Sequence, residues 1–353
     1  MLAEARTFHD PQQHAGAIQG WRQVYDQLGR GCLTSELRQL SAERFQIFQE
    51  VLDKRVVQRG YAPKGRLCAA MSLGSAPVVQ GQQVGTHSVV LLRDGEEFVL
   101  HAPEGMHFFA FNVDTVRFAK LAVFELSGDQ LKRLKSTSQL SVDDALLLRI
   151  RQRIQPLFSH LLKQTDAINS TAEKMLEEEL LGAFLDLFSH ATDEVRCRRG
   201  NFAVSAYLVK RCQELIDASG DTPLSILDLC EQLRVSRRTL QNSFQAVTGM
   251  RPVEYLRNLR LNAVRRRLIT TSACTHNIGE IAVAMGFFHL SHFAAHYRQL
   301  FGESPSETPR AMAIVSRSDS RAAWPVFERA RIAQAWAGTI NVTPDSNHRF
   351  DRF

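Results

Sequence analysis

The feature of this chain that most constrains its fold is a helical unit that occurs twice between Ile226 and Pro305. Ile226, Leu229 and Leu233 form an apolar stripe with helical spacing, and Ile278, Ile281 and Met285 repeat it 52 residues later. The stripe Leu240, Phe244 and Val247, followed by Gly249 and Pro252, returns 53 residues later as Phe293, Tyr297, Leu300, Gly302 and Pro305. The one-residue difference falls at Gly286–Phe288, where a turn absorbs it. Two helix-turn-helix units in tandem explain the pattern.

Residue types at the helix ends indicate where each helix begins. Ser236 is suited to an N-cap because its hydroxyl can accept a hydrogen bond from an exposed backbone amide. Gly249 is suited to end that helix, and Pro252 to open the next. The 17 residues from Val253 to Ile269 read as one rod helix, roughly 25 Å long. We expect it to hold the second helices of the two units about 34 Å apart on one face, which is one turn of DNA.

Positive charge is concentrated in the same region. The whole chain carries a formal charge of +6, whereas Arg234 to Arg267 contain nine arginines and one acid, Glu254, a local net charge of 9 − 1 = +8. Such a region favours an anionic partner such as nucleic acid. An architectural or RNA-binding protein that binds without sequence preference is the alternative, and the duplicated units argue against it.

These segments resemble the DNA-binding domain of the AraC-type (AraC/XylS) transcription regulators over about 105 residues. The resemblance rests on "LSILDLCEQLRVSRRTLQNSF", "LRLNAVRR", "IGEIAVAMGF" and "SHFAAHYRQLFGESPSE". Within that family the upstream half, with "WRQVYDQL", is similar to regulators of ethanolamine-utilisation operons. The resemblance implies an upstream domain that senses a small molecule and often dimerises. It further implies an amine-type metabolite or a cobalamin as effector, and RNA polymerase as a partner on double-stranded promoter DNA.

The first unit offers polar groups for reading bases. After the N-cap Ser236, the outward positions are Arg237, Arg238, Gln241 and Asn242. Arginine can bond two acceptors of guanine, and Gln or Asn can pair with adenine. The alternative is a solvated helix face with some phosphate contacts. About two of the rod arginines (257, 260, 265, 266 and 267) are expected to reach phosphates, because helical spacing spreads the five around the helix.

The second unit offers few polar groups. The resemblance places Leu290, Ser291, Ala294 and Ala295 toward the groove. They can offer apolar contact to thymine methyl groups, a serine hydrogen bond, or only a fit of shape, with His289, His292 and Arg298 as phosphate anchors. We therefore expect the first unit to discriminate between bases and the second mainly to position the protein.

The upstream half has a β-rich texture. Short apolar runs separated by turn signals such as Asp94-Gly95 predict a small barrel or sandwich over residues 17–130, after a loose lead-in. The stretch 37–53 reads as a strand that runs into a turn or short helix. Residues 131–195 read as helical. Their apolar stripe (Leu146, Leu147, Ile150, Ile154, Leu157, Leu161, Leu162) fits a homodimer interface and packing on the chain's own barrel equally well.

Catalytic and metal-binding patterns are missing from the sequence. It has no G-x-S-x-G, G-x-x-x-x-G-K or H-E-x-x-H motif, so we predict that the protein is not an enzyme. His87, His101 and His107 are too dispersed for a metal-binding barrel, and the cysteines lack zinc spacing, so no metal is predicted. Phe98, Phe108, Phe109 and Phe111 fit core packing better than an effector pocket. With no secretory signal and no membrane-length apolar run, we expect a cytoplasmic protein.

The sequence thus predicts an α+β fold. A β-rich effector-sensing domain (17–130) is followed by a helical connector (131–195), an all-α tandem helix-turn-helix domain (202–310) and a flexible tail (311–353). The basic segment Arg196–Asn201 is predicted to be a linker between the helical connector and the helix-turn-helix domain. The predicted function is a small-molecule-responsive activator of transcription of a catabolic operon.

Overall fold

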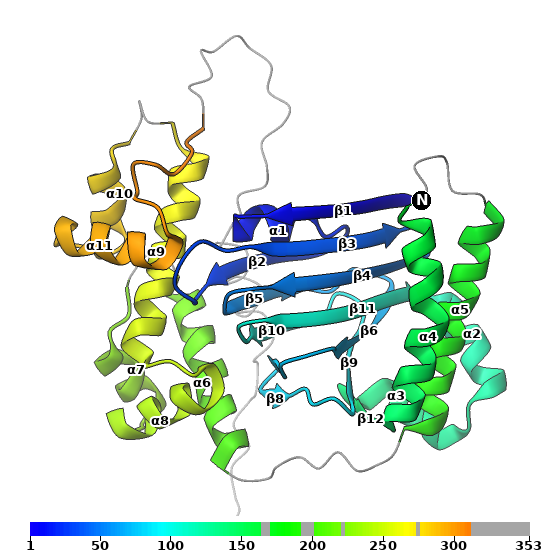
Figure 1. The fold of residues 1–353 in the computed structure, drawn as a ribbon. Helices are drawn as coiled ribbons and strands as arrows, with labels where there is room; N and C mark the ends of the chain where they lie inside the picture. The colour runs from blue at the N-terminus through cyan, green and yellow to red at the C-terminus, as the bar shows by residue number, and fades with distance from the viewer. Residues whose placement is uncertain (164–169, 192–200, 220–222, 273–275, 312–353) are drawn as a thin grey trace, which may run out of the picture.

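A computed structural model describes residues 1–163, 170–191, 201–219, 223–272 and 276–311. The linker predicted around Arg196 and the tail predicted after Ala311 lie outside the described residues. The chain forms a β-rich domain with a helical layer, followed by an all-helical domain, so the predicted fold class is confirmed (Figure 1).

The N-terminal domain contains two antiparallel sheets. The larger sheet has the strand order β1-β3-β4-β11-β6-β9-β12, and the smaller sheet has the order β2-β5-β10-β7-β8. The strands are β1 (Leu2–Phe8), β2 (Arg22–Gln27), β3 (Ser35–Ser41), β4 (Phe45–Leu52), β5 (Val56–Tyr61), β6 (Arg66–Ser72), β7 (Val78–Val79), β8 (Gln82–Gln83), β9 (Ser88–Leu92), β10 (Glu97–Ala102), β11 (Met106–Asp114) and β12 (Gln139–Ser141).

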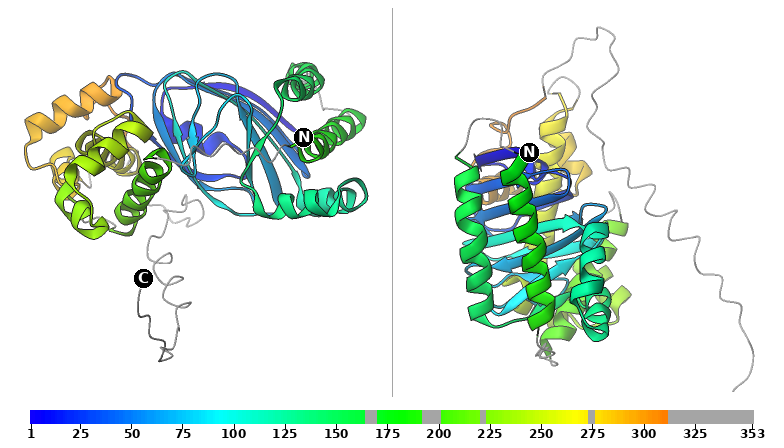
Figure 2. Two further views of the ribbon diagram at one scale, coloured as in Figure 1. Left: turned by 90° about the horizontal axis from the view of Figure 1, so that it is seen from below. Right: turned by 90° about the vertical axis from the view of Figure 1, so that its right-hand side faces the viewer.

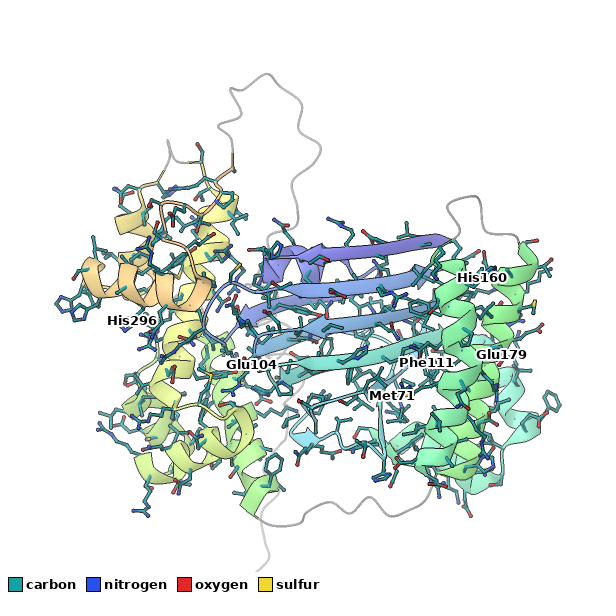
Figure 3. The ribbon with its side chains drawn as sticks, in the orientation of Figure 1. Met71, Glu104, Phe111, His160, Glu179 and His296 are labelled. Atoms are coloured by element: carbon teal, nitrogen blue, oxygen red, sulfur yellow. The ribbon has the colours of Figure 1, made fainter. Side chains whose placement is uncertain are left out.

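The central strand β11 of the larger sheet is covered on both faces, whereas the edge strand β1 is largely exposed. Side chains alternate along a strand, so Phe108 and Ala110 of β11 join the core between the sheets. Phe109 and Phe111 point the other way, into the core under the helices. Figure 3 shows Phe111 and Met71 in the sheet beside those helices. A strand with both faces covered favours apolar residues, as in the run Phe108–Phe111 of β11, although Asn112 of the same strand is polar and buried.

Of two predictions about the N-terminal domain, one is wrong and the other is right only for the strand and the turn that follows it. The loose lead-in is β1, which pairs with β3 from Leu2↔Ser41 to Phe8↔Ser35, followed by α1 (Pro11–Ala17). The stretch 37–53 contains no helix: it is most of the hairpin β3–β4, registered from Ser35↔Leu52 to Ser41↔Gln46. The sheets therefore extend from Leu2 to Ser141, beyond the predicted limits of 17 and 130.

A helical layer covers the outer face of the larger sheet. It consists of α2 (Thr115–Glu125), α3 (Gly128–Ser136), α4 (Asp144–Leu161) and α5 (Ser170–His190). The right-hand view of Figure 2 shows α4 and α5 in front of the strands. Phe184 of α5 packs on Phe111 with ring centroids 5.0 Å apart. The predicted leucine stripe is used in this core: Leu146, Leu147, Ile150, Ile154 and Leu161 are buried, and Leu157 and Leu162 pack against them. Of the two uses left open, packing on the chain's own sheet is the one observed.

The C-terminal domain has the predicted helices. They are α6 (Asn201–Ala218), α7 (Ile226–Leu233), α8 (Arg237–Thr248), α9 (Pro252–Thr270), α10 (Ile278–Ala284) and α11 (Leu290–Phe301). Gly249 and Gly302 end α8 and α11 in the left-handed conformation, with φ of 67° and 78°. Pro252 opens α9, the predicted rod helix. Within the described ranges, no helix combines the length and apolar character needed to cross a membrane.

The two domains share an apolar cluster. Leu28, Val57 and Val78 of the N-terminal domain belong to the same core as Val209 of α6 and Tyr255 of α9. The smaller sheet therefore lies between the larger sheet and the C-terminal domain, as the left-hand view of Figure 2 shows.

Candidate nucleic-acid interface

The first unit presents α8 with its predicted polar face in solvent. Arg234 adopts a left-handed conformation (φ 54°) in the turn after α7, and Ser236 Oγ accepts the backbone N–H of Thr239 at 3.1 Å, as an N-cap does. Leu240 and Phe244 are fully buried on the inner face. The residues predicted to read bases are all exposed: Ser236, Arg237, Arg238, Gln241 and Asn242. This face can offer two guanidinium groups and two amides to a DNA groove.

The second unit presents α11 in the same way but with different chemistry. Phe293, Tyr297 and Leu300 are buried, as the repeat requires. The predicted contact residues are again all exposed: His289, Leu290, Ser291, His292, Ala294, Ala295 and Arg298. The N-cap residue, His289, makes no capping hydrogen bond through its side chain. Ser291 and the imidazoles are the few polar groups near the start of this helix.

Most arginines of the rod helix α9 are engaged within the protein. Arg265 is buried and pairs with Asp10 (2.9 Å) and Glu303 (2.5 Å). Burial acts to lower the pKa of its guanidinium, but Tyr297 and the two carboxylates outweigh burial and raise it. Arg266 pairs with Asp26.

The other three rod arginines differ in exposure. Arg260 donates to the Leu224 carbonyl at 2.6 Å. Arg257 lies 3.3 Å from His296 of α11, which Figure 3 labels. Arg267 alone among the five rod arginines is exposed. About two of the five rod arginines were expected to contact phosphate, and only one of the five, Arg267, is exposed.

Two asparagines of α9, which the sequence reading missed, join the domains. Asn262 Oδ1 accepts the backbone N–H of Gln27 (2.9 Å), and its Nδ2 donates to the Gln27 carbonyl (2.8 Å). Asn258 Nδ2 donates to the Leu28 carbonyl (3.0 Å). Gln27 ends β2, an edge strand whose outer backbone groups need partners. Asn258, Asn262 and Arg266 are four residues apart, so they form one polar stripe on the buried face of the helix.

The second helix of each helix-turn-helix unit, α8 or α11, is its recognition helix. The N-terminal domain also contacts the C-terminal end of each recognition helix. Arg55 donates to the Gly249 carbonyl at the end of α8 (3.4 Å). At the end of α11, the Gly31 N–H donates to Gln299 O (3.1 Å) and Gln27 Nε2 to Leu300 O (2.7 Å). The N-terminal ends of both helices, which carry most of the predicted base-reading residues, are left exposed.

A cavity of about 40 Å³ lies between the two sheets. Its wall is almost entirely apolar and includes Trp21, Phe48, Phe98 and Phe108. Of the four phenylalanines that the sequence reading assigned to the core, Phe98 and Phe108 thus also line a cavity, whereas Phe109 and Phe111 do not.

A cluster of polar side chains around Glu50 lies at the cavity. Glu50 accepts from Gln58 Nε2 (2.9 Å) and from the Tyr25 hydroxyl, and His14 Nε2 lies 3.4 Å away. Burial raises the pKa of Glu50 to about 7 and lowers that of His14 to about 3. A protonated Glu50 facing a neutral imidazole follows from both shifts, so the pair carries no net charge below about pH 7.

The three histidines considered for metal binding lie apart. His101 is buried against the Tyr255 hydroxyl (3.3 Å), and burial lowers its pKa to about 4. His87 lies 2.7 Å from Asp144 at the surface. Over the described residues, no group of three or more His, Cys, Asp or Glu side chains is arranged to hold a metal ion.

Comparisons with known proteins identify the C-terminal domain. Residues 229–311 match a family model described as a helix-turn-helix domain. The XylDLEGF operon transcriptional activator of Pseudomonas putida is 39% identical over 101 residues, which are 29% of this chain and 32% of that protein. The probable thc operon regulatory protein of Rhodococcus erythropolis is 32% identical over 105 residues, 30% of this chain and 32% of that protein. The matches thus span about a third of the length of these relatives.

Solved structures give weaker likenesses. The AraC-like transcriptional activator CuxR is 13% identical over 74% of this chain and 94% of its own, with a TM-score of 0.37. An AraC-type DNA-binding protein from Chromobacterium violaceum is 34% identical over 30% of this chain and 92% of its own, with a TM-score of 0.27. The sequence relatives are named as regulators of operons, not as enzymes. The C-terminal domain, with its duplicated units, is therefore a helix-turn-helix domain, and its sequence is similar to that of operon regulators.

Proposed function

We propose that the whole protein is a sequence-specific transcription activator that responds to a small molecule. The observation that carries the DNA-binding part is the face of α8, where two arginines and two amides are exposed after the N-cap. These are the groups that pair with guanine and adenine in the major groove. The first unit discriminates between sequences, and Arg298 with His289 and His292 anchors the second unit on phosphates.

Binding to selected duplexes tests this proposal. A duplex is selected from a random library with the full-length protein, and its affinity is compared with that of random DNA at one salt concentration. Arg238→Ala lowers the preference for the selected duplex, since it removes a base contact worth about 1–3 kcal/mol. Arg298→Ala weakens binding to both DNAs by a similar factor because phosphates carry no sequence information. Equal affinity of the wild type for both DNAs would favour the architectural or RNA-binding alternative.

The cavity between the sheets supports the response to a small molecule. A volume of about 40 Å³ exceeds the roughly 10–15 Å³ that one water needs, but is far below the roughly 300–1,000 Å³ of sites for drug-sized ligands. A molecule of a few heavy atoms fits, whereas a cobalamin is much too large. Above about pH 7, where Glu50 is ionised, its negative charge disfavours a ligand carboxylate and favours a protonated amine, which agrees with the amine-type effector that the sequence resemblance implies. The finer likeness to ethanolamine-operon regulators stays a prediction.

A pair of matched ligands tests the choice of an amine. 2-Aminoethanol raises the midpoint of thermal unfolding of the wild type, whereas the uncharged ethane-1,2-diol, of nearly the same shape, does not. Glu50→Gln removes the difference because the amide carries no negative charge. Equal effects of both compounds, or of neither, would contradict an amine effector in this cavity.

Strand β2 supports a route from the cavity to the DNA-binding domain. Tyr25 faces the cavity, whereas Asp26 pairs with Arg266 and the backbone of Gln27 pairs with Asn262 on α9. A ligand that displaces Tyr25 must move residues bonded to the rod helix. RNA polymerase is the partner expected of an activator, and a homodimer would have to use a surface other than the buried leucine stripe of α4.

A further inference from the structure

Backbone hydrogen bonds identify the residue by which the two units differ. In the first unit, Arg234 N donates to Glu231 O and Val235 N to Cys230 O. In the second, Gly286 N donates to Val283 O and Phe287 N to Ala282 O, which are the same bonds 52 residues later. Arg234 and Gly286 share a positive φ. Val235 and Phe287 both pack against the core of their unit.

The additional residue is therefore Phe288. The N-caps that follow, Ser236 and His289, are 53 residues apart, so one residue has been added between Phe287 and His289. Phe288 is 77% exposed, and Leu290 beside it is 47% exposed. The second unit thus carries an apolar protrusion, where the first unit has no corresponding residue.

This protrusion lies at the N-terminal end of α11. The C-terminal end of the helix is bonded to Gly31 and Gln27 of the N-terminal domain, so its start points away from that domain (Figure 1). A helix of 12 residues places its two ends about 18 Å apart. The first turn of a recognition helix is the part that contacts base edges in the major groove.

The apolar side chains at the N-terminal end of α11 are suited to contact with one base, thymine. Leu290, Ala294 and Ala295 cannot hydrogen-bond through their side chains, so the helix face reads few donors or acceptors. Thymine alone among the four bases presents a methyl group in the major groove, and apolar side chains contact it. His289 and His292, whose rings lie 5.9 Å apart, flank the tip with groups that can bond phosphate.

We propose that Phe288, together with Leu290, binds the methyl group of thymine and gives the second unit its own base preference. The inference rests on the proposed binding to duplex DNA. It also gives a larger part in base reading to the second unit, which was expected mainly to position the protein.

Replacement of thymine by deoxyuridine tests the proposal, because it removes only the methyl group. Each thymine of a duplex selected with the full-length protein is replaced in turn. The wild type loses about fourfold in affinity at one or two positions of one half-site, the loss expected for one methyl no longer buried. Phe288→Ala binds the thymine duplex about as weakly as the wild type binds the uracil duplex, and it no longer distinguishes the two.

Phe124→Ala is the matched control, since Phe124 is 87% exposed but lies on α2 in the helical layer. It keeps both the affinity and the loss on uracil substitution. Unchanged melting temperatures establish that both variants fold. A wild type indifferent to every replacement, or a Phe288→Ala variant that keeps the full discrimination, overturns the proposal while the binding of DNA stands. If no duplex is preferred over random DNA, both the proposal and the proposed function fail.

Discussion

Replacement of Asn262 by alanine should open the contact between the two domains. The side chain is 2% exposed and makes two hydrogen bonds to the backbone of Gln27, at 2.9 and 2.8 Å. Each such bond contributes about 1 kcal/mol net, and a buried group left without a partner costs about 1–3 kcal/mol. Because alanine leaves both the N–H and the C=O of Gln27 unpaired, we expect a loss of about 2–4 kcal/mol at this contact.

Hydrogen exchange of the backbone amides measures the loss where it occurs. In the wild type the amide of Gln27 donates to Asn262, so its exchange requires that β2 and α9 separate, whereas the amide of Leu28 donates to Arg55 O within the N-terminal domain. A loss of 2 kcal/mol or more speeds that exchange at least about 30-fold, since 1.4 kcal/mol is a factor of ten. Asn262→Asp gives a similar increase, because its second oxygen faces the Gln27 carbonyl where Nδ2 donated.

Asn112→Ala is the control for general destabilisation. Asn112 is 1% exposed and donates to Gln46 Oε1 (3.0 Å) inside the N-terminal domain, so its loss leaves the contact between the domains intact. It lowers the urea midpoint of unfolding without speeding exchange of the Gln27 amide under native conditions. A wild-type exchange rate of the Gln27 amide in Asn262→Ala would refute the reasoning that the two bonds of Asn262 hold the domains together.

Three further changes test other parts of the structure. Glu50→Gln should stabilise the protein relative to the wild type at pH 8 but not near pH 5. The pKa of Glu50 is raised from 4.5 to about 7, so the stability that its protonated form contributes is lost as pH rises through 7, by up to about 3 kcal/mol. Urea midpoints of unfolding across that pH range measure the difference. Phe184→Ala should cost about 3–5 kcal/mol, because the fully buried ring packs on Phe111 and Phe118; a loss under 1 kcal/mol in urea unfolding would argue against the packing of α5 on the sheet. Ser236→Ala should cost about 1 kcal/mol through the lost N-cap of α8, whereas Ser236→Thr keeps the hydroxyl and most of that stability; equal melting temperatures of the two variants would contradict the cap.

The C-terminal domain could be predicted because its signals are local. The N-cap Ser236, the left-handed Gly249 and Gly302, and Pro252 at the start of α9 each act within one turn of the backbone. The exposure of the base-reading residues also follows from local spacing, since the inner positions of α8 and α11 are fixed by the apolar stripe.

The second strand of the hairpin β3–β4 could not be predicted because the turn before it carries only a weak signal. The chain reverses through Ser41, Ala42, Glu43 and Arg44, which include no glycine, proline, asparagine or aspartate. Ala and Glu are good helix formers, so the sequence leaves a turn and a short helix open after the first strand. Pairing with β1 and β11 on either side decides the outcome, and that information is not local.

The contact between the domains could not be predicted because its arginines have a more common role on helices. Arginine on a helix is most often solvated, and Arg265 and Arg266 were interpreted in that way or as phosphate ligands. Their partners, Asp10 and Asp26, lie some 240–255 residues away in the sequence. The available signal was the stripe Asn258, Asn262, Arg266 at spacings of four, since polar side chains on a buried face of a helix require partners.

The position of β2 at the edge of its sheet bears on how the cavity can influence the DNA-binding domain. Among the strands of the smaller sheet, β2 pairs only with β5, so a shift of β2 disturbs one ladder of hydrogen bonds, whereas a shift of β5 or β10 would disturb two. Burial acts to raise the pKa of Asp26, but Arg266 and Arg59 outweigh it and hold that pKa below its usual value, so the carboxylate stays charged at neutral pH. A charged group shared between Arg59 on β5 and Arg266 on α9 has two alternative partners within reach. An effector that moves Tyr25 can therefore redistribute the bonds of Asp26 between the two domains without unfolding either, which is the kind of two-state element that allosteric coupling requires.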